Sequence, residues 1–227
     1  MPRLRVHNLS MSLDGYVAGP RQDMEHPLGL GGEQLHGWLF ATAFGQAMLG
    51  HDGGSAGVDH AFAVAGTTGI GATIMGRNMF GPVRGPWLDK TGLEGTGLEK
   101  SGPDEQWRGW WGANPPFHHP VFVMTHYLRP ALAMEGGTTF HFVDAPPEVV
   151  LELAVEAAGG GDVRLGGGAA TVRAFLAAGL VDELHVALVP VLLGGGERLF
   201  DGPLEGYAVL PPVPGEGATH FRLAGHG

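Results

Sequence analysis

The sequence predicts an α/β fold in which a mixed sheet carries helices on both faces. Apolar runs typical of strands alternate along the chain with amphipathic segments typical of helices. The block Asp162–Phe200 contains a strand, a glycine turn, a helix and a second strand, which together make a βαβ unit. Hydrophobic residues occupy 44% of the 227 positions, which is enough for the core of one large domain.

Besides the strand that opens the βαβ block, seven apolar segments are expected to form strands. The first is Leu4–Met11, which the Asp14-Gly15 turn signal follows. Pro120–Thr125 is an apolar run typical of a central strand that is buried on both faces. Pro190 interrupts another apolar run and indicates a bulge or an edge, because proline has no N–H to donate. The remaining strands are expected at Gly69–Met75, Thr138–Val143, Leu184–Val189, Val191–Leu193 and Ala218–Leu223.

Three helices are expected from apolar residues at helical spacing. The first spans Glu33–Met48 and aligns Leu35, Trp38, Leu39 and Thr42. The second begins at Pro147 and has an apolar face of Val150, Leu153, Ala154 and Ala157. The third follows the glycine turn and buries Val172, Phe175, Leu176 and Leu180, with Gly179 as its C-cap.

The 41 glycines cluster outside these elements as well as in the βαβ block. Two clusters, Gly29–Gly57 and Gly81–Gly112, are interpreted as long surface excursions that cover a functional site or lack order. We therefore expect one domain over residues 1–227, with excursions near residues 25–60 and 81–117.

The composition excludes several classes of function. The 13 basic and 23 acidic residues give a net charge of −10, which argues against nucleic acid or an anionic membrane as partner. The absence of cysteine excludes disulfides, thiolate nucleophiles and cysteine metal sites. The N-terminal segment does not resemble a secretory signal, and no apolar run reaches the length of a transmembrane helix. A soluble, cytoplasmic protein is expected.

The glycine turn Gly166, Gly167 and Gly168 is a candidate phosphate site. Without Cβ atoms the backbone can approach a ligand closely, and the following helix aims its free N–H groups at the same point. Thr171 stands where the Rossmann fingerprint requires its third glycine, and no Lys-Ser/Thr pair of a Walker A loop follows. The alternative is a turn that needs glycine only for packing.

Two other strand ends carry polar groups. Arg77 follows Gly76 after an apolar strand, where a guanidinium can bind a phosphate. Thr125 and His126 stand at the end of the run PVFVMT, the carboxyl end of a strand, where α/β sheets bind ligands. Each residue is also compatible with an ordinary surface position. Together the three strand ends favour a dinucleotide site.

Neither a metal site nor a catalytic triad is predicted. The 12 histidines include His118 and His119, which are adjacent and would point to opposite faces of a strand. No HExxH motif is present. Ser10, His7 and Asp14 could be imagined as a triad, but no Gly-x-Ser-x-Gly elbow accompanies them.

Four segments are similar to the dihydrofolate reductase-like family that includes the reductase domain of bacterial riboflavin biosynthesis (the RibD C-terminal type). They are Ser12–Ala18, Met75–Phe80, Val121–Thr125 and most of Val163–Phe200. The resemblance covers the chain apart from the two glycine-rich excursions. It implies a mixed, mostly parallel sheet flanked by helices, an NADPH site along the carboxyl ends of the strands, and homodimers that pair through C-terminal strands.

The resemblance also implies roles for individual residues. The pyrophosphate would be cradled by Gly167, Gly168, Ala169 and Ala170. The phosphates would be met from the other side by Gly76, Arg77 and Asn78, with Thr125 and His126 beside the adenosine 2′-phosphate. The loop Asp14–Ala18 would line the nicotinamide, with Val17 and Ala18 offering backbone groups to its carboxamide and Asp14 near the reacting end.

Two departures from the family pattern bear on specificity. Family members commonly place arginine after the Ser/Thr at the 2′-phosphate, whereas this chain has His126, so the preference for NADPH over NADH is expected to be weaker. True dihydrofolate reductases carry a carboxylate on the first helix. Here Glu33 stands at the very start of that helix and its interior has no acid, so folate is not expected as the substrate.

These residues predict an NADPH-dependent reductase of a small, planar heterocyclic or carbonyl substrate. Asp14 would orient or protonate the substrate, or would only cap the turn after the first strand. Trp38 would stack on a flat substrate, or would only pack in the core. The alternative function is a cofactor-binding module or sensor without reductase activity. A purely structural protein, which would bind no nucleotide, is a third alternative.

Overall fold

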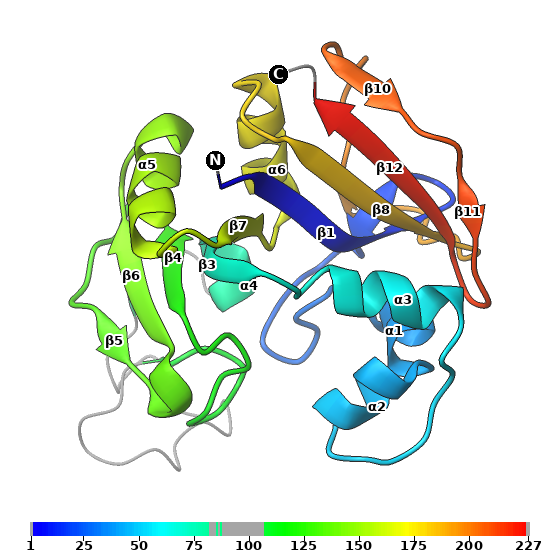
Figure 1. Cartoon of the computed structure of the whole chain (residues 1–227), viewed down its shortest axis with the longest axis horizontal. Helices are drawn as coiled ribbons and strands as arrows, with labels where there is room; N and C mark the ends of the chain where they lie inside the picture. Colours follow the sequence, from blue (N-terminus) through cyan, green and yellow to red (C-terminus); the bar gives the residue numbers. More distant parts are fainter. Residues whose placement is uncertain (1, 82–84, 86, 88–106, 226–227) are drawn as a thin grey trace.

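The computed structural model describes residues 2–81, 85, 87 and 107–225 (Figure 1). Its strands are β1 Leu4–Ser12, β2 Tyr16–Ala18, β3 Ile70–Gly76, β4 Pro120–Met124, β5 Leu132–Ala133, β6 Thr139–Val143, β7 Asp162–Leu165, β8 Glu183–Val189, β9 Glu197–Arg198, β10 Tyr207–Val209, β11 Val213–Pro214 and β12 Thr219–Gly225. Its helices are the 3₁₀ turns η1 Gly32–His36 and η3 Glu135–Gly137, and α1 Gly37–Phe40, α2 Ala43–Met48, α3 Val58–Ala65, α4 Arg77–Phe80, α5 Pro147–Ala157 and α6 Ala169–Ala177.

A ten-stranded sheet organises the described chain, in the order β10-β12-β8-β1-β7-β3-β4-β6-β5, with β11 paired to β12. The central strands from β8 to β6 are parallel, and antiparallel strands stand at both edges. The predicted mixed, mostly parallel sheet is confirmed. Because the central strands are parallel, their carboxyl ends meet along one edge, where such sheets bind ligands.

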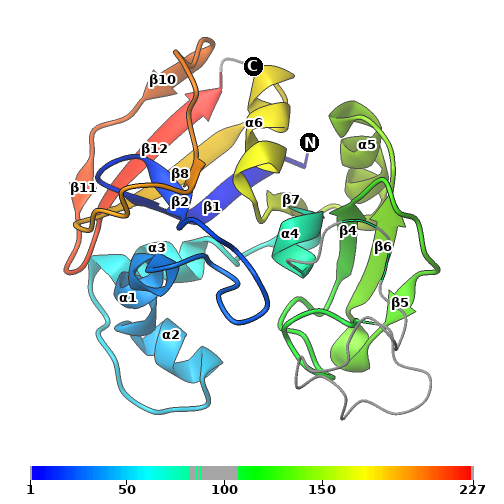
Figure 2. The ribbon, with the colours of Figure 1, turned by 180° about the vertical axis from the view of Figure 1, so that it is seen from behind.

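Helices cover both faces of this sheet (Figures 1 and 2). On one face, Val150 of α5 and Phe175 of α6 share a core cluster with Ile74 of β3. The neighbouring residue Met75 points to the opposite face and packs with Phe80 of α4 in a second cluster. A third cluster holds the residues Leu35, Trp38, Ala63, Ala187, Val189 and Ala218, which join η1, α1 and α3 to β8.

Most predicted elements form within one or two residues of their expected ends, but the first helix does not. Glu33–Met48 is divided into η1, α1 and α2. The division falls at Thr42, whose backbone is extended and whose Oγ1 accepts a hydrogen bond from the Gly45 N–H at 3.0 Å. A threonine that caps a new helix in this way competes with continuation of the old one.

Two other expectations are corrected. The excursion near residues 25–60 contributes to the core, since Leu35 is 0% exposed, and it is followed by the unpredicted helix α3. Val191–Leu193 does not form a strand. After Pro190, the Val191 carbonyl instead accepts the Leu13 N–H at 2.9 Å, which ties this segment to the end of β1. Most of the excursion near residues 81–117 lies outside the described residues.

A buried relay of hydrogen bonds joins four elements. The Asn8 N–H donates to His185 Nδ1 at 3.1 Å, so His185 Nε2 donates to His220 Nδ1 at 3.0 Å. His220 Nε2 then donates to Asp59 Oδ1 at 2.8 Å, and Asp59 Oδ2 accepts the Gly217 N–H at 2.7 Å. The relay therefore fixes both tautomers and connects β1, β8, β12 and α3.

The buried histidines predict loss of stability in mild acid. Burial lowers the pKa of His185 to about 2 and that of His7 to about 4, whereas an unfolded histidine titrates near 6.5. Below about pH 6.5 the unfolded chain therefore binds more protons, and the free energy of unfolding falls by up to about 1.4 kcal/mol per pH unit for each such group.

Urea unfolding at pH 7.5, 6.0 and 5.0 measures the free energy of unfolding at each pH. These values lie above the pH range in which carboxylates titrate, so the histidines dominate the change. We expect lower stability at pH 5.0 than at pH 7.5, and a smaller difference for His185→Asn. Equal free energies of unfolding at the two pH values in the wild type would contradict the prediction.

Candidate functional site

The carboxyl ends of four adjacent strands form one continuous edge. β7, β3, β4 and β6 are neighbours in that order and run parallel. Gly166 follows β7, Arg77 follows β3, Thr125 follows β4 and Asp144 follows β6. The sheet therefore brings together the three strand ends that the sequence singled out, and adds a fourth.

The glycine turn is hydrogen bonded to the end of β3. The Gly166 N–H donates to the Ile74 carbonyl at 2.8 Å, and the Gly76 N–H donates to the Gly167 carbonyl at 2.7 Å. Gly167 has φ +126°, a conformation that favours glycine. A Cβ on Gly76 would collide with Thr171, so glycine is also required there.

The turn leads directly into α6. Gly168 is the N-cap of α6 and provides no side-chain cap, so the first N–H groups of the helix, including those of Ala169 and Ala170, have no side-chain acceptor there. A Cβ built on Gly168 meets no protein atom within 4 Å, which means that space is open above it. Free N–H groups beside open space suit a phosphate or pyrophosphate.

Arg77 stands at the start of α4 with its guanidinium over the Trp87 ring, 3.2 Å from the ring centroid. Its Nη1 lies 3.5 Å from Thr125 Oγ1 and 3.5 Å from the Gly85 carbonyl, both long for hydrogen bonds. Burial, and then the charge of Arg129, lower the pKa of Arg77 to about 10, so it remains charged at neutral pH.

Arg129 is a second cation at this place that the sequence reasoning missed. It lies 4.9 Å from the centroid of the same Trp87 ring and donates to the Trp107 carbonyl at 2.8 Å. Within the described residues, neither Arg77 nor Arg129 pairs with a carboxylate, and the Nε atom of each is buried without a partner. Two repelling cations without an acid attract an anion.

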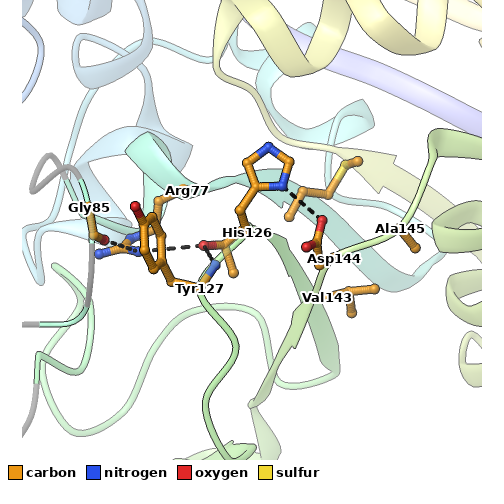
Figure 3. A pocket seen from close by; sticks show the side chains of 9 residues that line it. Arg77, Gly85, His126, Tyr127, Val143, Asp144 and Ala145 are labelled. Atoms are coloured by element: carbon orange, nitrogen blue, oxygen red, sulfur yellow. Dashed lines mark hydrogen bonds and ion pairs between the residues drawn. The ribbon is translucent and has the colours of Figure 1, made fainter.

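A cavity of about 280 Å³ opens beside Arg77 (Figure 3). Figure 3 shows its lining side chains around the ends of β4 and β6. The lining residues are Arg77, Gly85, Met124, Thr125, His126, Tyr127, Val143, Asp144 and Ala145. The cavity thus contains three of the predicted cofactor residues, and Asn78 follows Arg77 in α4 with its Oδ1 buried and unpartnered.

His126 and Asp144 form a pair on this cavity. His126 Nδ1 lies 2.8 Å from Asp144 Oδ1, and the side chains are 90% and 47% exposed (Figure 3). Asp144 was not among the predicted site residues, although an acid directly after a predicted strand is a usable signal. It places a carboxylate beside the position expected for the adenosine 2′-phosphate.

Asp14 is engaged by the backbone of a distant loop. Its carboxylate accepts the N–H groups of Leu193 at 3.2 Å and Gly194 at 2.7 Å. A hydrogen bond from Ser12, followed by these N–H groups, lowers the pKa of Asp14 to about 2 despite an opposing effect of desolvation. Asp14 is therefore ionised at neutral pH and has no proton to donate, and the geometry agrees with a cap of the loop.

The two residues expected at the nicotinamide lie in β2. Ala18 is 7% exposed and Val17 packs partly against the main core cluster. β2 pairs with β9, and Arg173 of α6 donates a hydrogen bond to the Arg198 carbonyl of β9. This small sheet is therefore attached to the helix that begins at the glycine turn.

Trp38 does not fit a role in stacking on a substrate. Its side chain is 2% exposed, and its Nε1 donates to Ser10 Oγ at 2.9 Å. The ring meets His220 edge-on, with 5.2 Å between ring centroids. Burial against the sheet leaves Trp38 a core residue, which was the other interpretation of its helical spacing.

Neither a metal cluster nor a membrane span is found in the described part of the chain. There, three or more His, Asp or Glu residues are not grouped in a way that could hold a metal ion. Among the same residues, every helix is too short or too polar to cross a membrane.

Comparison with known proteins extends this picture. A protein assigned to riboflavin biosynthesis from Shewanella sp. PV-4 is 22% identical over 99% of both chains, with a TM-score of 0.59. A pyrimidine reductase-like protein from Corynebacterium diphtheriae is 13% identical over 99% of this chain and 92% of its own, with a TM-score of 0.51. Dihydrofolate reductase from Enterococcus faecalis, complexed with NADP(H), is 13% identical over 99% of this chain and 97% of its own, with a TM-score of 0.50.

At these identities the solved structures establish the fold. No curated protein matches the chain. The model of the RibD C-terminal domain family, however, matches residues 6–206, which is most of the sequence. The chain therefore belongs to the RibD C-terminal domain family and has a dihydrofolate reductase-like fold.

Proposed function

We propose that residues 1–227 form one reductase domain that binds NADPH and transfers a hydride to a small heterocyclic substrate. The observation that carries the proposal is the convergence of the glycine turn, the start of α6 and two arginines at one edge of the sheet, neither of which has an acidic partner among the residues that the structure describes. Membership of the RibD C-terminal domain family supports it. So does the likeness in fold to the Enterococcus faecalis reductase, which was solved as a complex with NADP(H).

The residues at this edge suit a dinucleotide phosphate. The open space above Gly168 and the N–H groups of Ala169 and Ala170 would receive the pyrophosphate. Arg77 would meet a phosphate from the β3 side, and the cavity between β4 and β6 would take the adenosine end. When bound, the nicotinamide would supply the hydride, so the protein itself needs no nucleophile.

The remaining predicted residues would position the reacting end. Val17 and Ala18 would present backbone groups from β2 to the carboxamide. Asp14 would hold the loop at Leu193 and Gly194 against the end of β1 and thereby keep β2 and β9 in place. Since Asp14 is ionised, the proton that accompanies the hydride would come from water or from another group.

The expected homodimer remains a prediction. β10 is an edge strand of the large sheet, and Val209 at its end is 66% exposed. An edge strand of this kind is the place where a second copy could pair.

Removal of the Arg77 charge is expected to weaken NADPH binding. For Arg77→Met we expect a dissociation constant about 10- to 100-fold larger, because a charge-assisted hydrogen bond to phosphate contributes about 1.5–3 kcal/mol. Calorimetric titration measures this constant. Arg3→Met is the control, because Arg3 precedes the amino end of β1 whereas Arg77 follows the carboxyl end of β3, and it should bind as the wild type does. Equal affinity of Arg77→Met and Arg3→Met would contradict the assignment.

The substitution Gly168→Ala adds a methyl group to the glycine turn and tests whether the pyrophosphate binds there. Gly168 has a φ of −73° that alanine also adopts, and its Cβ would meet no protein atom, so Gly168→Ala should fold normally. The methyl group would occupy the space proposed for the pyrophosphate and lower NADPH affinity at least about tenfold. Gly202→Ala, another site with open space, is the control. Unchanged affinity in a folded Gly168→Ala protein would place the pyrophosphate elsewhere.

Oxidation of NADPH against a panel of pterins, pyrimidines and quinones tests the reductase activity itself. We expect turnover with at least one nitrogen heterocycle, and we expect Asp14→Asn to lower turnover much more than NADPH affinity, because the loop position is disturbed and the cofactor phosphates are not. NADPH binding without oxidation of any compound would favour a cofactor-binding module. Full turnover of Asp14→Asn would show that the contacts of Asp14 with the Leu193–Gly194 loop do not position the reacting end.

A further inference from the structure

A polar strip crosses one face of the central sheet between two apolar clusters. Arg164 of β7 stands beside Arg5 of β1 and Thr73 of β3 in the strand register, so the three side chains share one face. Beyond Thr73 the same row continues into Val121 of the cluster under α4. Toward β8 the same face carries the cluster with α1 and α3. β7, the strand that carries Arg164, lies between β1 and β3 (Figure 1).

The neighbouring arginine on β1 has an acidic partner, and both of its Nη atoms are hydrogen bonded, although its Nε has no partner. Arg5 Nη1 lies 3.1 Å from Asp162 Oδ2 and 3.1 Å from the Thr68 carbonyl, and Nη2 donates to the Ala65 carbonyl at 2.7 Å. Asp162 also pairs with Arg3 at 3.4 Å. The acid nearest to Arg164 in sequence is therefore already engaged by two other arginines.

The second acid on this face is engaged as well. Glu183 lies 3.1 Å from His7 Nε2 and 3.6 Å from Arg3 Nη1. No ion pair or hydrogen bond of the Arg164 guanidinium exists within the described residues, and its Nε is buried without a partner. Arg164 is thus a partly buried cation, with a buried Nε, beside acids that are engaged by other groups.

Two histidines flank Arg164. Burial, and to a smaller extent the charges of nearby arginines including Arg164, lower the pKa of His119 and of His7 to about 4, so both rings are neutral at pH 7. His119 Nε2 is 2.8 Å from Thr73 Oγ1. Arg164 is therefore the permanent charge of this group, with neutral hydrogen-bonding rings around it.

A partly buried cation without a carboxylate opposes folding to the extent that its lost hydration is not replaced, and here that applies to the Nε side of the Arg164 guanidinium. Such groups are retained where a ligand supplies the missing charge. A guanidinium presents paired N–H groups that match two oxygens of a carboxylate or a phosphate.

We propose that Arg164, with His119 and His7 beside it, is a binding site for an oxyanion group of a small molecule, either a phosphate or a carboxylate. The site lies on the face toward α1 and α3, two residues before the glycine turn at Gly166. It is distinct from the Arg77 site, which follows the carboxyl end of β3. Only the assignment of this oxyanion to the substrate rests on the proposed reductase function.

Anion titrations followed by thermal unfolding test the site. Inorganic phosphate and acetate are added separately to the wild type, Arg164→Met and Arg222→Met. Arg222 is the control, because its Nε is also buried without a partner but it lies on β12. Each series is run with NADPH at saturation and, without NADPH, in the Arg77→Met background. In the first condition NADPH occupies the proposed cofactor site, and in the second the Arg77 charge is absent from it. Both conditions therefore suppress phosphate binding at the cofactor site.

We expect at least one anion to raise the melting temperature of the wild type and of Arg222→Met, with an apparent dissociation constant at least tenfold larger in Arg164→Met. A response to phosphate alone identifies a phosphate ligand, and a response to acetate a carboxylate ligand. Without anion, Arg164→Met should be as stable as the wild type or more stable, because an uncompensated charge has been removed.

Three results would overturn the proposal: no response of the wild type to either anion, equal responses of the wild type and Arg164→Met, or a loss of stability in anion-free Arg164→Met. The last would show that Arg164 has a structural partner. The Arg77→Met series measures anion binding at the Arg164 site without NADPH. It therefore gives a result even if the protein does not bind NADPH, and failure of this proposal can be distinguished from failure of the proposed function.

Discussion

The site depends on the hydrogen bonds that hold the glycine turn to the end of β3. The Gly76 N–H meets the Gly167 carbonyl at 2.7 Å and the Gly166 N–H meets the Ile74 carbonyl at 2.8 Å, so the start of α6 and the start of α4 are fixed relative to each other. The parallel register of β7, β3 and β4 then sets where Arg77 and Thr125 lie. The phosphate-binding geometry is thus a property of the sheet rather than of any one loop.

Charge is distributed unevenly in this acidic protein. Arginines at the amino end of the sheet, such as Arg3 and Arg5, have carboxylate partners. Arg77, Arg129 and Arg164 have none among the described residues, and their Nε atoms are buried. Arg222 of β12 shares this state, so the three positions are proposed as places where an anionic ligand would contribute charge because of where they lie in the sheet, and not because of the missing partner alone. Two of them belong to the proposed cofactor site and one to the face beneath it.

The part of the sheet that α3 covers is held by buried polar contacts. The relay from His185 through His220 to Asp59 joins β8, β12 and α3. The low pKa of His185 keeps its imidazole neutral at pH 7. Phe62 covers it, with its ring centroid 4.0 Å from that of His220. This relay locks α3 to the sheet. Fully satisfied buried networks of this kind specify one arrangement of the elements they connect.

Local patterns in the sequence were sufficient to predict most of the strands, the later helices and the glycine turn. Hydrophobic periodicity and the backbone freedom of glycine depend only on residues close together in the sequence. The local patterns also indicated Arg77 and Thr125, since strand ends can be read along the chain. The burial of Trp38, the presence of Asp144 and Arg129 at the site, and the unpaired state of Arg164 among the described residues emerged only from the folded chain. Asp14 illustrates the reason: the Gly194 N–H that it binds is 180 residues away. Such partners are set by strand order and register, which no local pattern encodes.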